Sequence, residues 1–372
     1  MKKTILLLLT IITIFSSCEQ KKPDPTNTIF FFYPWSTNLT NDFEGNIANF
    51  EYGITHKDLE KNRVVVFISK TESTAYMYEI KSIKGKIKHD TIAQYDNYEY
   101  RYTSTEGFTE ILNIAKGTTP TPQFSMIIGC HGDAWIPAAD MKRSFGASNV
   151  ESRIDISTLR NALKKSNLTA EYILFDVCYM SSIEVAYELR DVCRHLIASP
   201  AEIMSIGMPF RHIATDLLNT PNYEAICNDF YNFYAYQSFA PYGAIAIINC
   251  QELNQLANIV KQINTNHQYD DSKTANLQIY GTYGTQNNKP NIFYDLGDYI
   301  ASYCTDANLL QQFNTQMQKC IPYKAHTEYV YSMGGTPGPI QIKKYSGIST
   351  SAPSTNSKCA SYTETEWYKA TH

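Results

Sequence analysis

Two stretches of the sequence decide the predicted fold: residues 127–133, IIGCHGD, and residues 173–178, ILFDVC. Each is an apolar run that ends in a reactive side chain, a histidine in the first and a cysteine in the second. Apolar runs of this length are typical of strands buried on both faces of a parallel sheet. In open α/β sheets, the chemistry lies just beyond the carboxyl ends of the strands. We therefore expect His131 and Cys178 to meet there, as a thiol nucleophile and its proton acceptor must.

Strand and helix patterns alternate on both sides of these stretches, from about residue 60 to 265. The predicted strands are 63–69, 74–81, 86–94, 124–128, 172–175, 196–198 and 243–248, and the predicted helices are 104–116, 156–163, 181–192, 223–236 and 253–263. This alternation favours an α/β fold with a mostly parallel central sheet covered by helices. After residue 270 the pattern gives way to segments rich in Asn, Thr, Tyr and Gly with one clear helix at 296–303, which indicates an appended C-terminal subdomain.

The first residues of the chain predict export. Lys2 and Lys3 precede a short apolar run, 5–15, and then Ser16, Ser17 and Cys18. This is the pattern of a secretory signal, and the run is too short to span a bilayer. Its ending resembles the lipobox of bacterial lipoproteins, in which the cysteine becomes the acylated N-terminus; the alternative is ordinary cleavage with Cys18 incidental. We predict a protein of the cell envelope, held at the outer membrane or cell surface by a lipid on Cys18.

The predicted domains follow from these patterns. They are a lipoprotein signal peptide at 1–17, a tether and N-terminal extension at 18–57, a core at 58–268 and a C-terminal subdomain packed on the core at 269–372. The formal net charge is −4 and no basic block is present. Nucleic acid is therefore not an expected partner.

The nine cysteines do not indicate a disulfide scaffold or a zinc site. Apart from Cys18 they are scattered through apolar runs, without the tight spacing of either framework. A metal site built from Cys130, His131, Cys193 and His195 is disfavoured because no CxxC pair accompanies it. We expect no metal, and we expect most cysteines to be buried as small hydrophobic residues, with room for a disulfide or two.

The surroundings of the two reactive residues suit thiol chemistry. Only a thiolate attacks, so Cys178 needs a neighbour that lowers its pKa or takes its proton. Ser181 and Glu184 fit a capping box that opens a helix just after Cys178. The positive end of that helix would favour the thiolate by at most about 1 kcal/mol. Gly132 leaves the backbone open beside His131, where a peptide N–H can point at a developing oxyanion.

At these residues the sequence resembles a known family. Residues 131–135, HGDAW, resemble the HGxGW segment of the clostripain family of cysteine peptidases. Residues 174–180 and 184–189, LFDVCYM and EVAYEL, resemble that family's D-x-C-x-M and E-V-A-Y-E-L run. Weaker likenesses follow at 198–202, 293–296 and 346–349. The resemblance implies a caspase-like α/β/α sandwich and an endopeptidase with a Cys/His dyad.

Carried over position by position, the resemblance assigns roles to four residues. Cys178 is the nucleophile and His131 the general acid/base, while the N–H groups of Gly132 and Cys178 form the oxyanion hole. Asp176 matches the acidic residue of the S1 pocket. A carboxylate there suits arginine or lysine at P1, because a pair with Arg can be bidentate. The alternative for Asp176 is a cap on the helix that follows.

Two positions depart from the family pattern. Ala134 replaces the second glycine of HGxGW, and Asp133 adds a negative charge that would raise the pKa of His131 if the two side chains approach. Some relatives mature by self-cleavage between the two catalytic strands, where Lys142 and Arg143 offer a basic site here. Calcium is implied by the resemblance alone, since the acidic residues show no calcium-loop pattern; we expect no required cofactor.

The sequence thus predicts a lipid-anchored cysteine endopeptidase, monomeric, that acts on peptide or protein substrates after Arg or Lys. Two alternatives stay open. One is a surface-binding lipoprotein that keeps the peptidase fold without turnover. The other is transpeptidation, which starts from the same acyl-enzyme and differs only in the acceptor.

Overall fold

The computed structural model describes residues 25–34, 38–96, 101–118, 121–137, 153–282, 290–334 and 336–372. The predicted signal peptide, the predicted lipidation site Cys18 and the predicted processing site at Lys142 and Arg143 lie outside these ranges. Among the described helices, none has the length and apolar character needed to cross a membrane.

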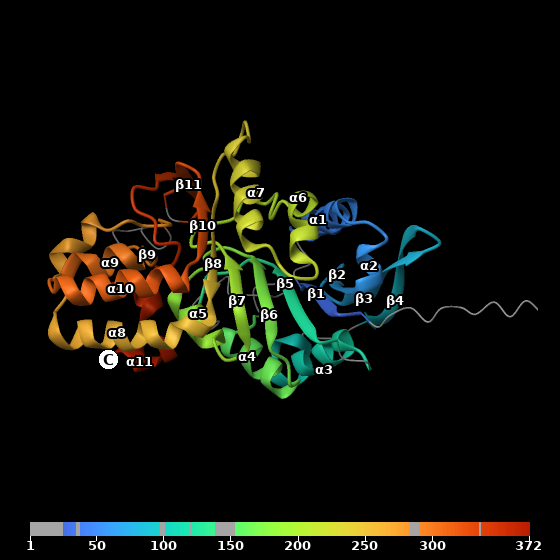
Figure 1. Cartoon of the computed structure of the whole chain (residues 1–372), viewed down its shortest axis with the longest axis horizontal. Coiled ribbons are helices and arrows are strands. Elements are labelled where there is room, and N and C mark those ends of the chain that lie inside the picture. Colours follow the sequence, from blue (N-terminus) through green and yellow to red (C-terminus); the bar gives the residue numbers. More distant parts are fainter. Residues whose placement is uncertain are drawn as a thin grey trace, which may run out of the picture.

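A nine-stranded sheet forms the centre of the molecule, in the order β10-β8-β7-β6-β5-β1-β2-β3-β4 (Figure 1). Its strands are β1 (Asn27–Tyr33), β2 (Asn62–Ser69), β3 (Thr74–Ile83), β4 (Lys86–Asp96), β5 (Gln123–Gly129), β6 (Ala170–Asp176), β7 (Cys193–Ala198), β8 (Ala244–Asn249) and β10 (Tyr323–His326). The five strands from β7 to β2 are parallel to one another, and the outer strands on both sides are antiparallel. The predicted α/β fold with a mostly parallel sheet is confirmed.

Helices cover both faces of the sheet (Figure 1). They are α1 (Thr40–Gly53), α2 (Asp58–Lys61), α3 (Thr105–Lys116), α4 (Ile156–Lys165), α5 (Ile183–Leu189), α6 (Phe210–Leu217), α7 (Tyr223–Ala235), α8 (Leu253–Asn266), α9 (Leu296–Tyr303), α10 (Ala307–Cys320) and α11 (Glu366–Thr371). Contacts join α1, α6 and α7 on one side, and α3, α4 and α5 on the other. The result is the α/β/α sandwich that the sequence predicts.

Strand β1 shows how the core is built. Successive side chains of a strand point to opposite faces. The Phe31 ring packs 4.9 Å from that of Phe50 in α1, whereas the Phe32 ring packs 4.7 Å from that of Phe108 in α3. From the sequence, this strand is expected to belong to the N-terminal extension at 18–57, outside the core. The structure differs: β1 lies between β2 and β5. Residues 29–33 are an apolar run like those of β5 and β6, and every residue of β1 is buried, so this segment is a core strand covered on both faces.

The C-terminal third is also part of the sheet. Strand β10 pairs antiparallel with β8, so the predicted appended subdomain supplies an edge strand. Two small sheets complete this region: a hairpin of β11 (Tyr329–Ser332) with β12 (Gly338–Gln341), and a pair of β9 (Tyr294–Asp295) with β13 (Ser349–Thr350). These short strands lack an apolar run, which is why the sequence pattern did not reveal them.

No disulfide joins the eight cysteines of the described chain. Seven of the eight are buried, as expected of small hydrophobic residues, and Cys178 alone among them is partly exposed. The disulfides for which the even count left room are therefore not formed in these residues. Partial exposure separates Cys178 from the cysteines that serve only to fill the core.

Candidate active site

The topology brings His131 and Cys178 to one place. Strands β5 and β6 are parallel neighbours, and Gly129 pairs in register with Asp176. His131 and Cys178 each follow their strand's paired residue by two positions, so both leave the sheet at the same level. The two loops touch: a methyl group added to Gly132 would lie 2.3 Å from Cγ1 of Val177 and 3.6 Å from the carbonyl oxygen of Cys178.

Cys178 is held as a neutral thiol. The N–H of Ile203 donates to its sulfur at 3.4 Å. Burial raises the pKa of the Cys178 thiol to about 12, and the carboxylate of Glu202 adds to this rise. The sequence had suggested that a helix end would favour the thiolate. That expectation fails because α5 begins only at Ile183, five residues after Cys178, and burial and a nearby carboxylate raise the thiol pKa more than the end of this seven-residue helix lowers it. The thiol must therefore lose its proton to a base during attack.

His131 has a partner that sequence reasoning missed. Its Nε2 lies 3.2 Å from Oδ1 of Asn38, which precedes α1 and stands far away in sequence. An amide oxygen can only accept a hydrogen bond, so the contact suits the tautomer with the proton on Nε2, in which Nδ1 can accept a proton. Asn38 sits in no motif, and only the packing of α1 against the sheet brings it to the ring.

Asp176 is a buried carboxylate at the end of β6. Its Oδ2 accepts a hydrogen bond of 2.9 Å from Nδ2 of Asn46 in α1. Gly207, with φ +69°, passes so close that an added methyl group would lie 2.6 Å from the same oxygen. Burial raises the pKa of Asp176 to about 7, and the charge of Asp42 adds to it. Asp176 does not cap the next helix, because the N-cap of α5 is Ser182.

The predicted capping box at Ser181 and Glu184 does not form. The N-cap, Ser182, makes no capping hydrogen bond, and the Ser182 hydroxyl donates to the Glu184 carboxylate instead. Glu184 is buried and also accepts from Oγ1 of Thr350 at 2.8 Å and from the N–H of Ser351 at 2.9 Å. A local pattern predicted a cap, but a distant strand supplies better partners. Glu184 ties the C-terminal segment to the helix that follows Cys178.

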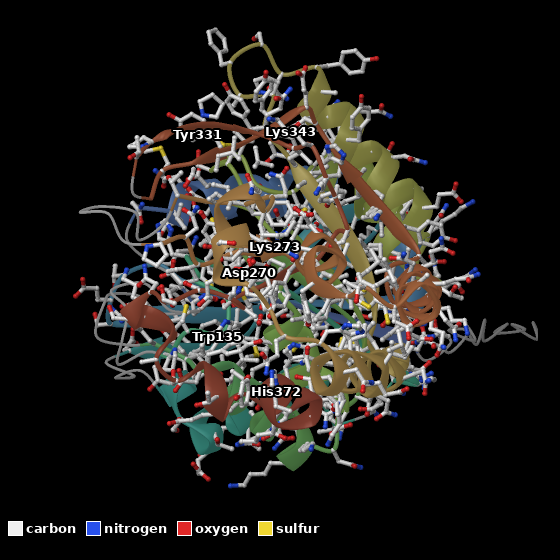
Figure 2. All side chains as sticks on the ribbon, turned by 90° about the vertical axis from the view of Figure 1, so that its left-hand side faces the viewer. Trp135, Asp270, Lys273, Tyr331, Lys343 and His372 are labelled. Carbon is white, nitrogen blue, oxygen red and sulfur yellow. The ribbon has the colours of Figure 1, made fainter. Side chains whose placement is uncertain are left out.

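Trp135 provides a second such tie, from the histidine loop. Its indole N–H donates to Oγ of Ser351 at 2.8 Å, and its ring meets that of Tyr362 edge-on at 5.8 Å. Figure 2 places Trp135 on the side of the molecule that also carries His372 at the C-terminal end. Ala134, where the family segment has glycine, has a φ of +56°, a region that favours glycine. The last part of the chain thus supports both the loop of His131 and the segment that follows Cys178.

A cysteine and a histidine at the carboxyl ends of neighbouring parallel strands, inside an α/β/α sandwich, define a caspase-like cysteine hydrolase. Residues 46–369 match the model of the clostripain family, and the chain belongs to that family of cysteine peptidases. Its identity as a peptide-bond hydrolase follows from this membership.

Three solved structures resemble the chain. A secreted C11 cysteine protease from Bacteroides thetaiotaomicron, "iotapain", is 42% identical with a TM-score of 0.88, over 94% of this chain and 100% of that one. A clostripain from the same organism, in complex with a peptide inhibitor, is 45% identical with a TM-score of 0.58, over 61% and 99%. An inactive zymogen C11 protease from Parabacteroides distasonis is 25% identical with a TM-score of 0.79, over 94% and 98%. No curated protein matches the chain.

The contact between the two loops leads to a test at Gly132. We expect Gly132→Ala to lower peptidase activity by about 100-fold, because the added methyl group overlaps Val177 and shifts the reacting groups by about 1 Å. Gly45→Ala in α1 is the matched control, since a methyl group there meets no atom within 4 Å. Initial rates of peptide hydrolysis measure both variants. Wild-type activity in Gly132→Ala would contradict the described contact.

Proposed function

We propose that this protein is an exported endopeptidase that cuts after arginine or lysine, with Cys178 as nucleophile and His131 as general acid/base. The observation that supports this specificity is the burial of the Asp176 carboxylate without a cationic partner among the described residues. Its carboxylate is buried, stands two residues before Cys178 and, in the part of the chain that the structure describes, forms no ion pair. A buried carboxylate without a cation is costly. The cationic side chain of a substrate supplies what is missing.

The proposed reaction has two halves. In the first, Nδ1 of His131 takes the thiol proton as the sulfur attacks the scissile carbonyl, and the N–H groups of Gly132 and Cys178 bind the oxyanion. The C–N bond then breaks and His131 returns the proton to the leaving amine. In the second half, His131 takes a proton from water, whose oxygen attacks the thioester; the C–S bond breaks and the thiol is protonated again.

The raised pKa of the Cys178 thiol fits this order of events. With a pKa of about 12, almost no free thiolate exists at neutral pH, so proton transfer and attack must be coupled. Coupled proton transfer depends on the orientation of the imidazole ring relative to the thiol. The hydrogen bond from Nε2 to Asn38 holds the ring in one tautomer and one orientation. Asn38 is in this proposal the residue that orients the base.

Relatives support the proposed substrate class and setting. The clostripain that is 45% identical was crystallised with an inhibitor of peptide sequence VLTK, which ends in lysine before its AOMK group. The 42% identical protease is described as secreted, which supports export of this chain, and the proposed lipid anchor at Cys18 rests on the lipobox-like ending of the signal. A relative described as an inactive zymogen supports maturation by cleavage, for which Lys142 and Arg143 are the proposed site.

The test is hydrolysis of four fluorogenic peptides that differ only in P1: Arg, Lys, Ala and Asp. We expect cleavage after Arg and Lys and little after Ala or Asp. Cys178-dependent cleavage with another preference would keep the peptidase and reject the role of Asp176. Transfer of the acyl group to an added amine faster than to water would indicate transpeptidation. Absence of turnover, also after nicking at Lys142–Arg143, would favour the non-catalytic binding lipoprotein.

A further inference from the structure

Glu202 lies beside the nucleophile, and the proposed reaction does not use it. It follows β7 and directly precedes Ile203, whose N–H donates to the sulfur of Cys178 at 3.4 Å. The hydroxyl of Tyr179, the residue after Cys178, donates to Oε1 of Glu202 at 2.8 Å. Glu202 is thus attached to the nucleophile's loop through both of its neighbours.

The same carboxylate oxygen binds a second segment of the chain. Oε1 of Glu202 also accepts from Oγ of Ser332 at 3.1 Å, from the N–H of Met333 at 2.8 Å and from the N–H of Gly334 at 3.2 Å. These three residues follow or end β11, at the tip of the hairpin of β11 and β12. One oxygen therefore joins the nucleophile's loop to a hairpin more than a hundred residues away.

The hairpin stands at the sheet edge that holds Cys178. Strand β8 is antiparallel to β7, so its first residues lie at the carboxyl ends of the parallel strands. Just before β8, the Tyr242 ring packs 5.2 Å from that of Tyr331 in β11. At the tip, Met333 is 61% exposed although its backbone N–H is anchored by Glu202. Because Glu202 is also bonded to the loop of Cys178, the tip presents this apolar side chain close to the nucleophile.

We propose that Glu202 is a positioning residue of the peptidase. Its carboxylate holds the hairpin tip against the nucleophile's loop, so that the tip forms one wall of the substrate site and Met333 contacts an apolar side chain of the bound peptide. This inference rests on the proposed function of Cys178 and adds a substrate preference to it: an apolar residue close to the scissile bond, besides the basic residue at P1.

The charge of Glu202 has an effect separate from its hydrogen bonds. The charged groups that act on the Cys178 sulfur are the carboxylates of Glu202, Asp133 and Asp176, and all three raise the pKa of the thiol, Glu202 most among them. His131 lies in the loop after β5, which meets the loop of Cys178 where Gly132 approaches Val177. Removal of the Glu202 charge lowers the thiol pKa and increases the thiolate fraction at a given pH. Glutamine keeps the accepting oxygen and removes the charge, so the two effects can be measured separately.

The experiment compares Glu202→Gln, Glu202→Ala and Met333→Ala with the wild type. The matched control is Glu328→Gln. Glu328 is exposed and directly precedes β11 of the same hairpin, and its carboxylate accepts a hydrogen bond from Nε2 of Gln341 at 3.2 Å. KM and kcat of each protein are measured on two peptides that share a basic P1 residue. The two peptides differ at one position adjacent to P1, which is leucine in one and glycine in the other. Each protein is also treated with iodoacetamide across pH, and intact mass follows the alkylation of Cys178.

We expect Glu202→Ala to raise KM by about tenfold with a smaller change in kcat, since the tip loses its charge-assisted hydrogen bonds. Glu202→Gln should keep KM close to the wild-type value while Cys178 is alkylated faster at each pH. Met333→Ala should raise KM for the leucine peptide and not for the glycine peptide. Glu328→Gln should match the wild type in every measurement.

Two results would overturn the inference. One is a wild-type KM in Glu202→Ala, and the other is an equal KM ratio for the two peptides in Met333→Ala and the wild type. If Glu202→Ala does not fold, Glu202→Gln and Met333→Ala decide the matter. If the wild type hydrolyses no peptide, the proposed function fails, and the alkylation profile of Glu202→Gln still tests the effect of Glu202 on Cys178.

Discussion

Replacement of Cys178 by alanine is expected to reduce peptide hydrolysis by about 10⁴-fold or more, because in the proposed reaction the acyl-enzyme forms on its sulfur. Among the described cysteines, the other seven are buried and Cys178 alone is partly exposed, so none of the seven is expected to take over the attack. KM should change little, since the alanine removes only the sulfur. Steady-state kinetics on an Arg-P1 peptide measures the loss.

A second substitution sharpens this test. If Cys178 and His131 act as one unit, His131→Ala should cost nearly as much as Cys178→Ala, and the double variant no more than either. Cys227→Ala, which removes a buried thiol in α7, is the control and should retain full activity. Additive losses in the double variant would show that the two residues act independently, and substantial activity in Cys178→Ala would reject the nucleophile.

The reactive residues could be predicted because strand ends are visible in the sequence. The apolar runs before His131 and Cys178 mark buried strands, and the rule for α/β sheets then places both residues at one edge. The position of Asp176 follows from the same strand, but its proposed place in the S1 pocket comes from the family resemblance. In each case a long local pattern carries the information, and the register of β5 with β6 agrees with it.

The supporting residues could not be predicted in this way. Asn38, Asn46 and Glu202 are single polar residues in segments remote from both catalytic loops, and each acquires its role only when the chain folds. For Glu184 the sequence predicted a local partner, and that prediction was wrong. Its local spacing to Ser181 indicated a capping box, yet Thr350 and Ser351 compete successfully for the buried carboxylate. Partner choice for a buried polar group is decided by tertiary contacts, because leaving such a group unpaired costs more than any local cap contributes.

Asp176→Asn is expected to abolish the preference for a basic P1. The ratio of kcat/KM for an Arg-P1 peptide to that for an Ala-P1 peptide should fall by about 10²- to 10³-fold, the usual effect of removing one partner of a buried charge pair. Asparagine has nearly the same shape and keeps an oxygen that can accept the Asn46 hydrogen bond. The loss would therefore report the charge. An unchanged ratio would show that another group selects P1.

The pH dependence of that ratio tests the same assignment without a mutation. Burial raises the pKa of Asp176 to about 7, so the carboxyl is increasingly neutral as the pH falls below 7. A neutral carboxyl does not attract a cation, and the Arg-to-Ala ratio should therefore rise with pH through about 7. The ratio cancels the titration of Cys178 and His131, which affects both peptides equally. In Asp176→Asn the ratio should not depend on pH.

A substitution at Asp42 gives a second test of this titration. Its carboxylate is one of the causes that raise the pKa of Asp176, so Asp42→Asn should lower that pKa and move the midpoint of the ratio to lower pH. The preference for arginine should persist above the midpoint, because Asp176 itself is intact. Two results would assign the titration to a different group: a midpoint that does not move in Asp42→Asn, or a ratio that still depends on pH in Asp176→Asn. Either result would remove the link between the buried carboxylate and the choice of substrate.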